Sequence, residues 1–385
     1  MDFELTHQQK EIQTKAREFA LHAFSKEEAL ELDESYAFPR AIWEKACQAG
    51  LVGAHFPPEY GGKGFGVTEN ILIVEELCRA DSGIGMALSL ADFSSEVILR
   101  FGTPEQKQRC LFPVALGKAI SAGAYTEPDH GSDITLLFTT ATRERDSFVI
   151  NGAKTFITNG TIADFFVVLC QTDPEAKPPY RGQSTLLVEK GTRGFTATEI
   201  KPKMGIRMTS TAQLSFSDVR VPLSNLIGEE RRGFYQVLEF FDESRIEIAA
   251  QALGISQGAF DRALDHTRNR RQFGKRLIDF QATQHKLADM ATQIETARLL
   301  TYKAAWNYDQ ERIDPKLTSM AKMHAGRTAV EITGAAVELL GGYGYLAAHE
   351  VERFYRDAKI MEIYEGTKEI QKNTIASYLT GKHKS

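Results

Sequence analysis

The sequence has few cysteines, no long apolar run and no strong excess of one charge. The run at residues 165–170 is strand-like and far shorter than the roughly 20 residues of a membrane-spanning helix. With 51 acidic and 46 basic residues, the formal charge is −5, and no long basic run occurs, which argues against nucleic acid as the main partner. The cysteines are scattered without metal-ligand spacing, so we expect reduced structural thiols and no bound metal: Cys47, Cys78, Cys110 and Cys170. No signal or transit peptide pattern is visible at the first residues, so we expect a cytoplasmic protein without a membrane span.

Hydrophobic periodicity divides the chain into three segments. Residues 1–118 are almost entirely of helical pattern, residues 119–228 alternate short β-rich runs with turns, and residues 229–385 carry long apolar stripes at helical spacing. We therefore expect an α+β, mainly α, fold with an N-terminal helical domain, a middle β domain and a C-terminal helical bundle. Helical surface left over in that bundle would favour oligomerisation.

Local patterns predict individual elements. The pair Asn151-Gly152 between two β-rich runs predicts a hairpin. Apolar residues at helical spacing predict helices near residues 84–101 and 351–363, the second with Arg356 and Asp357 at its polar edge.

Glu365 follows directly after the second of these helices. Gly366 gives the backbone freedom for a helix-ending turn, and Thr367 can cap a second helix. A carboxylate on an ordered turn between packed helices can be aimed at a ligand more reproducibly than one on a mobile loop. An isolated Glu is more often solvated or capping, so from these residues alone both interpretations stay open.

Three further glycine-bearing loops have polar character. Residues 124–133 offer hydroxyls, backbone amides and little side-chain bulk, which suits close approach to a ring or phosphate but also an Asx-rich turn. Residues 269–276 are cationic, which suits a pyrophosphate or a solvated helix end. The paired glycines within residues 338–345 either admit a ligand or end a helix.

Ordered motifs along essentially the whole chain resemble the flavin-dependent acyl-CoA dehydrogenases. They are PPEYGG, TEPDHGSD, NGAKTFITNG, KMGIRMTSTAQLSFSDVRVP, RRQFGKRLIDFQATQHKLADM, GGYGY and RDAKIMEIYEGT. The resemblance implies a middle domain that is β-barrel-like, a C-terminal four-helix bundle and a homotetramer with FAD at subunit contacts. It also implies an acyl-CoA substrate and an electron-transferring flavoprotein as electron acceptor.

The same resemblance implies roles for individual residues. The flavin ring and ribityl-phosphate side would be surrounded by Tyr125, Thr126, Gly131, Ser132, Phe156 and Thr158. The pyrophosphate and adenosine of a neighbouring subunit's FAD would be reached by Arg270, Gln272, Phe273 and Gln281. The remaining dinucleotide contacts would be Glu338, Gly342, Thr367 and Glu369. The substrate would meet Ser132, Asp92, Phe93, Arg245, Tyr364 and Gly366.

Glu365 would be the catalytic base of such an enzyme. It would take the α-proton of the thioester while flavin N5 takes the β-hydride, and its own backbone N–H would help to hold the thioester carbonyl. Burial beside an apolar acyl chain would raise the pKa of this carboxyl towards the working pH. In some relatives the base lies just before the arginine that matches Arg245; here that position is Ser244, which cannot serve.

Departures from the family pattern bear on specificity. Phe156 stands where a Trp is usual, and Glu338 and Glu369 stand where Gln is usual, which weakens those two as dinucleotide contacts. Asp92 stands in the Ser place of a common Asn-Ser-Leu run, on a helix expected to line the acyl pocket.

Asp92 leaves two interpretations open. It either caps or pairs away from the ligand, or it reads the acyl group by hydrogen bonding or as an additional base on a ring or unsaturated chain. In the second case the substrate would be a short, branched or cyclic acyl-CoA, such as a cyclohexane- or cyclohexene-carboxyl thioester. The alternatives for the whole chain are an acyl-CoA oxidase-type flavoenzyme and a non-catalytic helical assembly protein.

Overall fold

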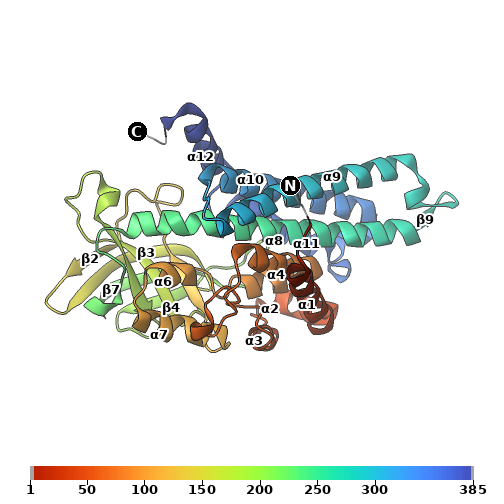
Figure 1. The fold of residues 1–385 in the computed structure, drawn as a ribbon. Coiled ribbons are helices and arrows are strands. Elements are labelled where there is room, and N and C mark those ends of the chain that lie inside the picture. Colours follow the sequence, from red (N-terminus) through yellow and green to blue (C-terminus); the bar gives the residue numbers. More distant parts are fainter. Residues whose placement is uncertain (1–3, 383–385) are drawn as a thin grey trace.

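The computed structural model describes residues 4–382. In Figure 1 a sheet lies at the left, the N-terminal helices lie along the lower side, and the long C-terminal helices run across the top and extend to the right. The predicted fold class, α+β and mainly α, is confirmed. Among the described residues, none of the helices has the length and apolar character needed to cross a membrane.

The N-terminal segment is helical, and several of its helices start at side-chain caps. The Thr6 hydroxyl accepts from the Gln9 backbone N–H, and Thr103 does the same for Gln106 at a helix that opens with Pro104. The helices are α1 (His7–Ala23), α2 (Lys26–Ser35), α3 (Arg40–Gln48), α4 (Val67–Ala80), α5 (Ser82–Ser89), α6 (Ser95–Phe101) and α7 (Pro104–Ala115).

The prediction of one helix near residues 84–101 is wrong. The chain forms α5 and α6 with a turn between them, and Ser94 in that turn has a left-handed backbone conformation (φ 72°). A residue in this conformation cannot continue an α-helix. Asp92 therefore lies in a tight connection, where its side chain is free of helical periodicity.

The middle segment is one sheet with the strand order β6-β7-β3-β2-β4-β5-β8 and with β1 parallel to β4. Its apolar strands pack on the N-terminal helices in one hydrophobic core. The strands are β1 (Ser121–Ala124), β2 (Thr140–Arg143), β3 (Ser147–Thr158), β4 (Phe165–Gln171), β5 (Gln183–Glu189), β6 (Phe195–Glu199), β7 (Thr211–Pro222) and β8 (Leu226–Ile227).

The hairpin predicted at Asn151-Gly152 is wrong, because β3 continues through both residues. Pairing with β7 along its length keeps the chain extended, and the register shifts between Ile150 and Gly152. The Asn151 side chain exchanges hydrogen bonds with the backbone and side chain of Asp218 on β7. A turn-forming pair is thus used as a bulge inside a strand.

The C-terminal segment is a bundle of long helices that run antiparallel (Figure 1). The carboxylate of Asp314 caps α10 at Pro315, as expected for a helix start. Short strands β9 (Arg271–Gln272) and β10 (Lys275–Arg276) form the far tip between two of the helices. The helices are α8 (Gly233–Asn269), α9 (Gln281–Asp309), α10 (Pro315–Leu340), α11 (Val351–Ala358) and α12 (Lys368–Thr380).

The end of α11 differs from the predicted helix over residues 351–363. The α-helix stops at Ala358 and tightens into a 3-10 turn over Lys359–Glu362. Asp357 is buried and not at a polar edge, because its carboxylate accepts hydrogen bonds from Ser82 Oγ (2.7 Å) and the Ile206 backbone N–H (2.6 Å). This carboxylate joins all three segments of the chain.

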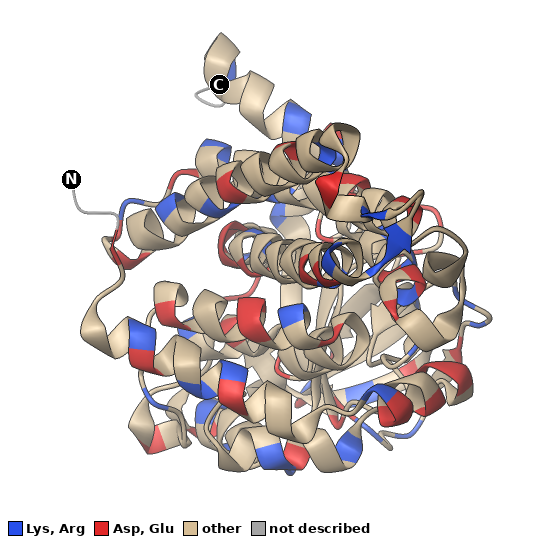
Figure 2. Ribbon diagram, turned by 90° about the vertical axis from the view of Figure 1, so that its right-hand side faces the viewer, with Lys and Arg blue, Asp and Glu red and all other residues tan. Residues whose placement is uncertain are grey.

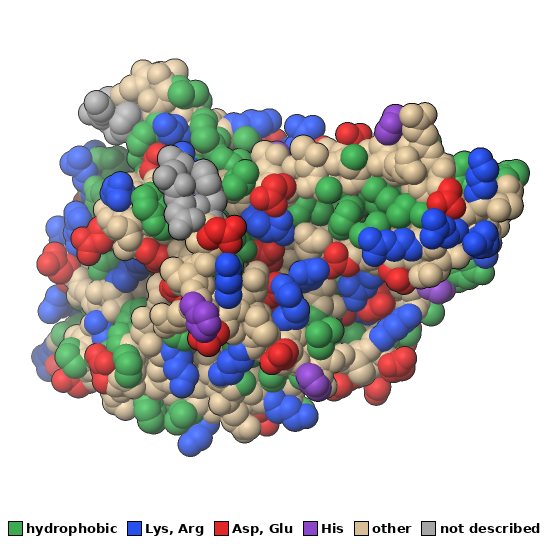
Figure 3. All heavy atoms as spheres, turned by 45° about the vertical axis from the view of Figure 1, so that its right-hand side comes forward, with side chains coloured by type: hydrophobic (Ala, Val, Ile, Leu, Met, Phe, Trp, Pro, Cys, Tyr) green, Lys and Arg blue, Asp and Glu red, His purple; other side chains and the backbone are tan. Residues whose placement is uncertain are grey.

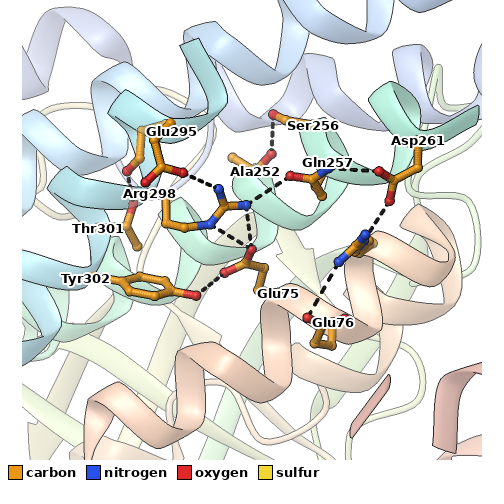
Figure 4. A network of polar contacts seen from close by, with 12 residues as sticks. Glu75, Glu76, Ala252, Ser256, Gln257, Asp261, Glu295, Arg298, Thr301 and Tyr302 are labelled. Carbon is orange, nitrogen blue, oxygen red and sulfur yellow. Dashed lines mark hydrogen bonds and ion pairs between the residues drawn. The ribbon is translucent and has the colours of Figure 1, made fainter. Parts of the chain in front are cut away.

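A buried polar network fastens the N-terminal helices to the bundle (Figure 4). The Arg298 guanidinium donates to Glu75 Oε1 (3.0 Å) and to the Gln257 side chain (3.0 Å), and Tyr302 donates to Glu75 Oε2 (2.7 Å). At Gly254 a side chain would come within 2.4 Å of the Glu75 carbonyl oxygen, so α4 and α8 approach as closely as glycine permits. The crossing fixes α8, which also carries Ser244 and Arg245.

In the view of Figure 2, Lys and Arg residues are interspersed with Asp and Glu residues over the helices. This distribution agrees with the absence of a long basic run in the sequence.

Candidate active site

Glu365 lies on a short turn between the 3-10 turn after α11 and the start of α12. It has a left-handed backbone conformation (φ 52°), and Gly366 after it has φ 90°. Such a conformation is costly for a side chain with a Cβ atom, and it persists only where the surroundings impose it. The Thr367 hydroxyl accepts from the Ile370 backbone N–H (3.3 Å), so Thr367 is the predicted cap of α12.

Two buried side chains hold the carbonyl groups of this turn. Lys322 on α10 donates from Nζ to the Gly366 carbonyl oxygen (2.6 Å). Gln371 on α12 donates from Nε2 to the carbonyl oxygens of Glu365 (3.0 Å) and Gly366 (3.1 Å). Burial lowers the pKa of Lys322 to about 7, although the nearby carboxylate of Glu365 opposes that change. The turn is therefore fixed from two helices at once.

The carboxyl group of Glu365 is held by α8. Ser244 Oγ donates to Glu365 Oε2 at 2.9 Å. Burial raises the pKa of Glu365, while the Ser244 hydrogen bond and the positive charges of Lys322 and Arg245 limit the rise. A carboxylate in this state has more proton affinity than an ordinary surface Glu, which suits a general base.

Arg245, next to Ser244, is a buried cation with spare hydrogen-bonding capacity. Its Nη1 lies 3.5 Å from Asp242 Oδ1, and its Nε has no hydrogen-bond partner among residues 4–382. Burial lowers the pKa of Arg245, and the charges of Asp242 and Glu365 counteract this.

Tyr364 connects the same turn to the N-terminal helices. Its hydroxyl donates to Gln251 Oε1 on α8 (2.5 Å), and Gln251 Nε2 donates to Ser89 Oγ at the end of α5 (3.0 Å). The chain of contacts leads from the Glu365 turn across α8 to the connection that contains Asp92.

Asp92 is buried, with 7% of its surface exposed, and Asp92 Oδ2 accepts from the Gly53 backbone N–H at 2.8 Å. Burial raises the pKa of Asp92 to about 6, and the charge of His55 opposes this. His55 Nε2 lies 3.0 Å from Glu96 Oε1. Although burial alone lowers the pKa of His55, contact with Glu96 raises it to about 9.

Phe93, beside Asp92, packs edge-to-face on Phe240 of α8, with ring centroids 5.1 Å apart. Tyr125 packs on Phe240 and Phe241, and its hydroxyl donates to Ser94 Oγ (3.0 Å). These aromatic rings form an apolar wall next to the polar groups of Asp92 and Ser94.

The other residues predicted at the flavin ring lie around the end of β3 and the loop after β1. The Thr126 carbonyl oxygen accepts from the Thr155 backbone N–H (2.9 Å), and Thr158 ends β3. Phe156 has 65% of its surface exposed, and a side chain at Gly131 would meet nothing within 4 Å. Ser132 is also exposed. A flat exposed ring thus lies beside a loop with little side-chain bulk.

Most residues predicted at the pyrophosphate and adenosine lie at the far tip of the bundle. A pocket of about 690 Å³ there is lined in part by Arg270, Gln272, Glu338 and Gly342. The Arg270 guanidinium lies over the Tyr343 ring, 5.4 Å from its centroid. Around the same tip, Phe273 is 92% exposed and Gln281 is exposed.

Glu338 and Glu369, the two acidic residues at positions where the family usually has Gln, are both exposed to solvent. Glu338 is exposed and pairs with Lys286 (2.6 Å), whose hydrogen bond lowers the pKa of Glu338. Glu369 is exposed in the first turn of α12. Neither carboxylate is left as an unpaired buried charge.

The residues predicted to bind one dinucleotide are not brought together within one chain. In Figure 1 the strands β9 and β3 lie at opposite ends of the molecule. Figure 3 shows hydrophobic side chains gathered along the bundle, with Lys and Arg side chains towards its free end. Exposed apolar residues on and around these helices include Leu299, Trp306, Tyr345 and Leu346.

Several residues of the site were missed by sequence reasoning. Lys322 is a cation on the otherwise apolar face of α10, and that position was a usable signal. Gln251 and His55 carry no comparable signal, because their partners Tyr364 and Glu96 lie far away in the sequence. Gln371 contacts Glu365 and Gly366 nearby in the chain, but a Gln in the first turn of a helix is not by itself a sign of such a contact.

Family models match three successive parts of the chain: the N-terminal domain of acyl-CoA dehydrogenase at residues 6–118, the middle domain at residues 122–219 and the C-terminal domain at residues 231–380. The chain belongs to the acyl-CoA dehydrogenase family, a family of flavin-dependent oxidoreductases. It is 44% identical over 377 residues to the short-chain specific acyl-CoA dehydrogenase of Clostridium acetobutylicum, which covers 98% of this chain and 99% of the relative.

Two solved structures are similarly close. Butyryl-CoA dehydrogenase from Megasphaera elsdenii superposes with a TM-score of 0.94 at 38% identity, covering 99% of this chain and 100% of that chain. A structure described as the electron transferring flavoprotein of Acidaminococcus fermentans gives a TM-score of 0.95 at 42% identity, covering 98% of this chain and 99% of that chain.

Proposed function

We propose that this chain binds FAD and dehydrogenates an acyl-CoA thioester, with Glu365 as the base that removes the α-proton. The observation that carries the proposal is the Glu365 turn. A non-glycine residue is held in a left-handed conformation by Lys322 and Gln371, and its half-buried carboxyl group is hydrogen-bonded to Ser244. Strain and burial of this kind concentrate at functional sites.

The residues present fit FAD. The exposed Phe156 ring and the open space at Gly131 leave room for a flat ring system near the sheet. At the bundle tip, Arg270 brings a cation to a pocket whose glycine, Gly342, leaves open space where a side chain would stand. Arginine suits a pyrophosphate, and bare backbone permits its close approach. When bound, FAD supplies a ring that accepts a hydride.

Two copies of the chain are needed to complete this FAD site. The ring-side residues and the tip residues lie at opposite ends of one chain, so we propose that Arg270, Gln272, Phe273 and Gln281 serve the dinucleotide of a neighbouring copy. The exposed apolar side chains along the bundle support such an assembly, with a homotetramer as the expected form. FAD content should therefore fall when the assembly is dissociated by dilution.

Within the site, each residue of the turn has a separate task. The carboxylate of Glu365 accepts the proton from the α-carbon, and its backbone N–H helps to hold the thioester carbonyl oxygen as negative charge develops there. Arg245 and Lys322 stabilise the ionised form of Glu365 before the transfer. The aromatic wall of Phe93 and Tyr125 excludes water from the acyl group.

For the substrate, we propose a short, branched or cyclic acyl-CoA. The relatives named as short-chain specific and butyryl-CoA dehydrogenases support a small acyl group. A buried carboxyl at Asp92 is unfavourable beside a long aliphatic chain and suits a cyclohexane- or cyclohexene-carboxyl thioester, where an additional base is useful. The name of one structural neighbour supports an electron-transferring flavoprotein as electron acceptor.

The test of the activity is an anaerobic titration of purified protein with a panel of acyl-CoA compounds. The protein should be yellow and should bleach with at least one short or cyclic member. A colourless protein that takes up no added FAD, or a yellow protein that no acyl-CoA bleaches, would reject the proposed activity.

The test of the acyl preference compares butanoyl-, octanoyl- and cyclohexanecarboxyl-CoA in the wild type, Asp92→Asn and Asp92→Ala. If the carboxylate reads the acyl group, the preference changes in both variants. The Asn variant keeps the volume and a hydrogen-bonding group, so a change there isolates the loss of the acid–base function. An unchanged preference in the Ala variant would reject a role for Asp92.

A further inference from the structure

Besides Asp92, this part of the site contains a second buried carboxyl group, that of Glu247, and this one has no partner. It has 8% of its surface exposed and makes no hydrogen bond or ion pair with any of residues 4–382. Some solvent-accessible surface remains on its unpartnered carboxyl oxygens, so they face a space that water can reach. A buried carboxyl group in a folded protein is normally hydrogen-bonded, so this one requires an explanation.

The helical spacing of α8 places Glu247 between the two parts of the site. Ser244, one turn before it, donates to Glu365, and Gln251, one turn after it, contacts Tyr364 and Ser89. Residues three and four apart share one face of a helix, so Glu247 lies on the face that looks towards the Glu365 turn and the Asp92 connection.

The neighbouring carboxylates are already partnered. Glu243 pairs with Arg100, Glu96 lies against His55, and Asp92 accepts from the Gly53 backbone N–H. Among residues 4–382 no cation pairs with Glu247. Arg245, two residues earlier on α8, lies by Asp242 and is influenced by the charge of Glu365. No group of His, Cys, Asp and Glu among residues 4–382 is arranged to hold a metal ion. Burial, with Asp92 as the next cause, raises the pKa of Glu247 well above its ordinary value. Burial without an ion-pair partner favours the neutral carboxylic acid form, which has one hydrogen to donate.

We propose that Glu247 is a specificity-determining residue that donates a hydrogen bond to the acyl group. The inference rests on the proposed function, because it places the acyl group between Glu365 and Asp92. The substrate class it selects has a hydrogen-bond acceptor on its acyl part, either an oxygen or the π face of a carbon–carbon double bond. A saturated hydrocarbon chain would leave this donor unsatisfied, which is unfavourable in a buried site.

The test uses binding, measured by the change in flavin absorption on adding ligand to a Glu365→Gln background that does not turn over. Cyclohexanecarboxyl-CoA is compared with tetrahydropyran-4-carboxyl-CoA, which replaces one CH2 by oxygen, and with cyclohex-1-enecarboxyl-CoA, which adds a π face. A net hydrogen bond corresponds to about tenfold tighter binding of an acceptor-bearing ligand. The two acceptor ligands distinguish an oxygen acceptor from a π acceptor.

Three second-site variants decide the role of the donor. Glu247→Gln keeps a donor of similar volume and should keep the preference within a few-fold, whereas Glu247→Leu and Glu247→Met should reduce the ratio of dissociation constants to about one. Glu239→Gln, at an exposed position of the same helix, should change nothing. FAD content shows that each variant is folded.

The inference is overturned if the acceptor ligands bind no better than cyclohexanecarboxyl-CoA, or if Leu and Met keep the preference. It is also overturned if Gln loses the preference to the same extent as Leu, because the group would then act as an anion. Failure of the proposed function is a different result, namely that no acyl-CoA bleaches the wild-type flavin.

Discussion

Removing the hydroxyl of Ser244 should change the pH dependence of the reaction in a defined direction. Its hydrogen bond to Glu365 stabilises the ionised carboxylate, which is the form that accepts a proton. In Ser244→Ala the pKa of Glu365 rises further, so the acid limb of the rate profile moves to higher pH. Above that limb Glu365 is ionised in both proteins, and the rates should converge.

The magnitude follows from the type of hydrogen bond. A hydrogen bond to a charged group contributes about 1.5–3 kcal/mol, and water entering the partly buried site replaces some of it. At the lower end of that range, about 1.5 kcal/mol, the pKa of Glu365 rises by about one unit, which corresponds to a rate lower by about tenfold at pH values below the limb. The assay is the single-turnover rate of flavin reduction at saturating acyl-CoA, measured between about pH 5 and about pH 9.

Ser256→Ala is the matched control. Ser256 is another buried serine of α8, and its hydroxyl donates within the helix to the Ala252 carbonyl oxygen (2.7 Å) (Figure 4). It should leave the pH profile in place. The reasoning is refuted if the limb of Ser244→Ala stays in place or moves to lower pH, or if its rate falls equally at every pH.

Two other substitutions test the turn and the dinucleotide pocket. Gly366→Ala should lower the rate of flavin reduction by at least about tenfold and the stability by about 1 kcal/mol, because the new Cβ would lie 2.6 Å from Gln371 Nε2 at a positive φ. Gly191 has a similar φ, but a Cβ there would meet nothing within 4 Å. Gly191→Ala should therefore reduce the stability in thermal unfolding and leave the rate unchanged. Equal rates in the two glycine variants would contradict this account. Arg270→Met should weaken FAD retention about tenfold or more in gel filtration, whereas Arg268→Met, which does not line the pocket, should retain it; equal FAD loss in both would remove Arg270 from the binding site.

The sequence predicted well those features that depend on local chemistry. Apolar stripes at helical spacing located the long helices, and the order Glu365-Gly366-Thr367 located the turn and the cap of α12. The mainly helical fold class followed from the same periodicity and from the family resemblance.

Features set by distant contacts could not be predicted in this way. Asn151-Gly152 has the composition of a hairpin turn, but pairing with β7 overrides that preference. The break at Ser94 and the support of the turn by Lys322 depend on residues far away in the chain. Such choices are made by packing and not by local propensity.

The most direct test of the account is the rate of flavin reduction by a short acyl-CoA in Glu365→Gln under anaerobic rapid mixing. Gln keeps the size of the side chain and can still hydrogen-bond to Ser244, but it cannot accept the α-proton. We expect FAD and acyl-CoA to bind as in the wild type while the rate falls by about 10²–10⁴-fold, as for loss of a general base. A Glu365→Gln protein that bleaches within tenfold of the wild-type rate would contradict the assignment of Glu365 as the base.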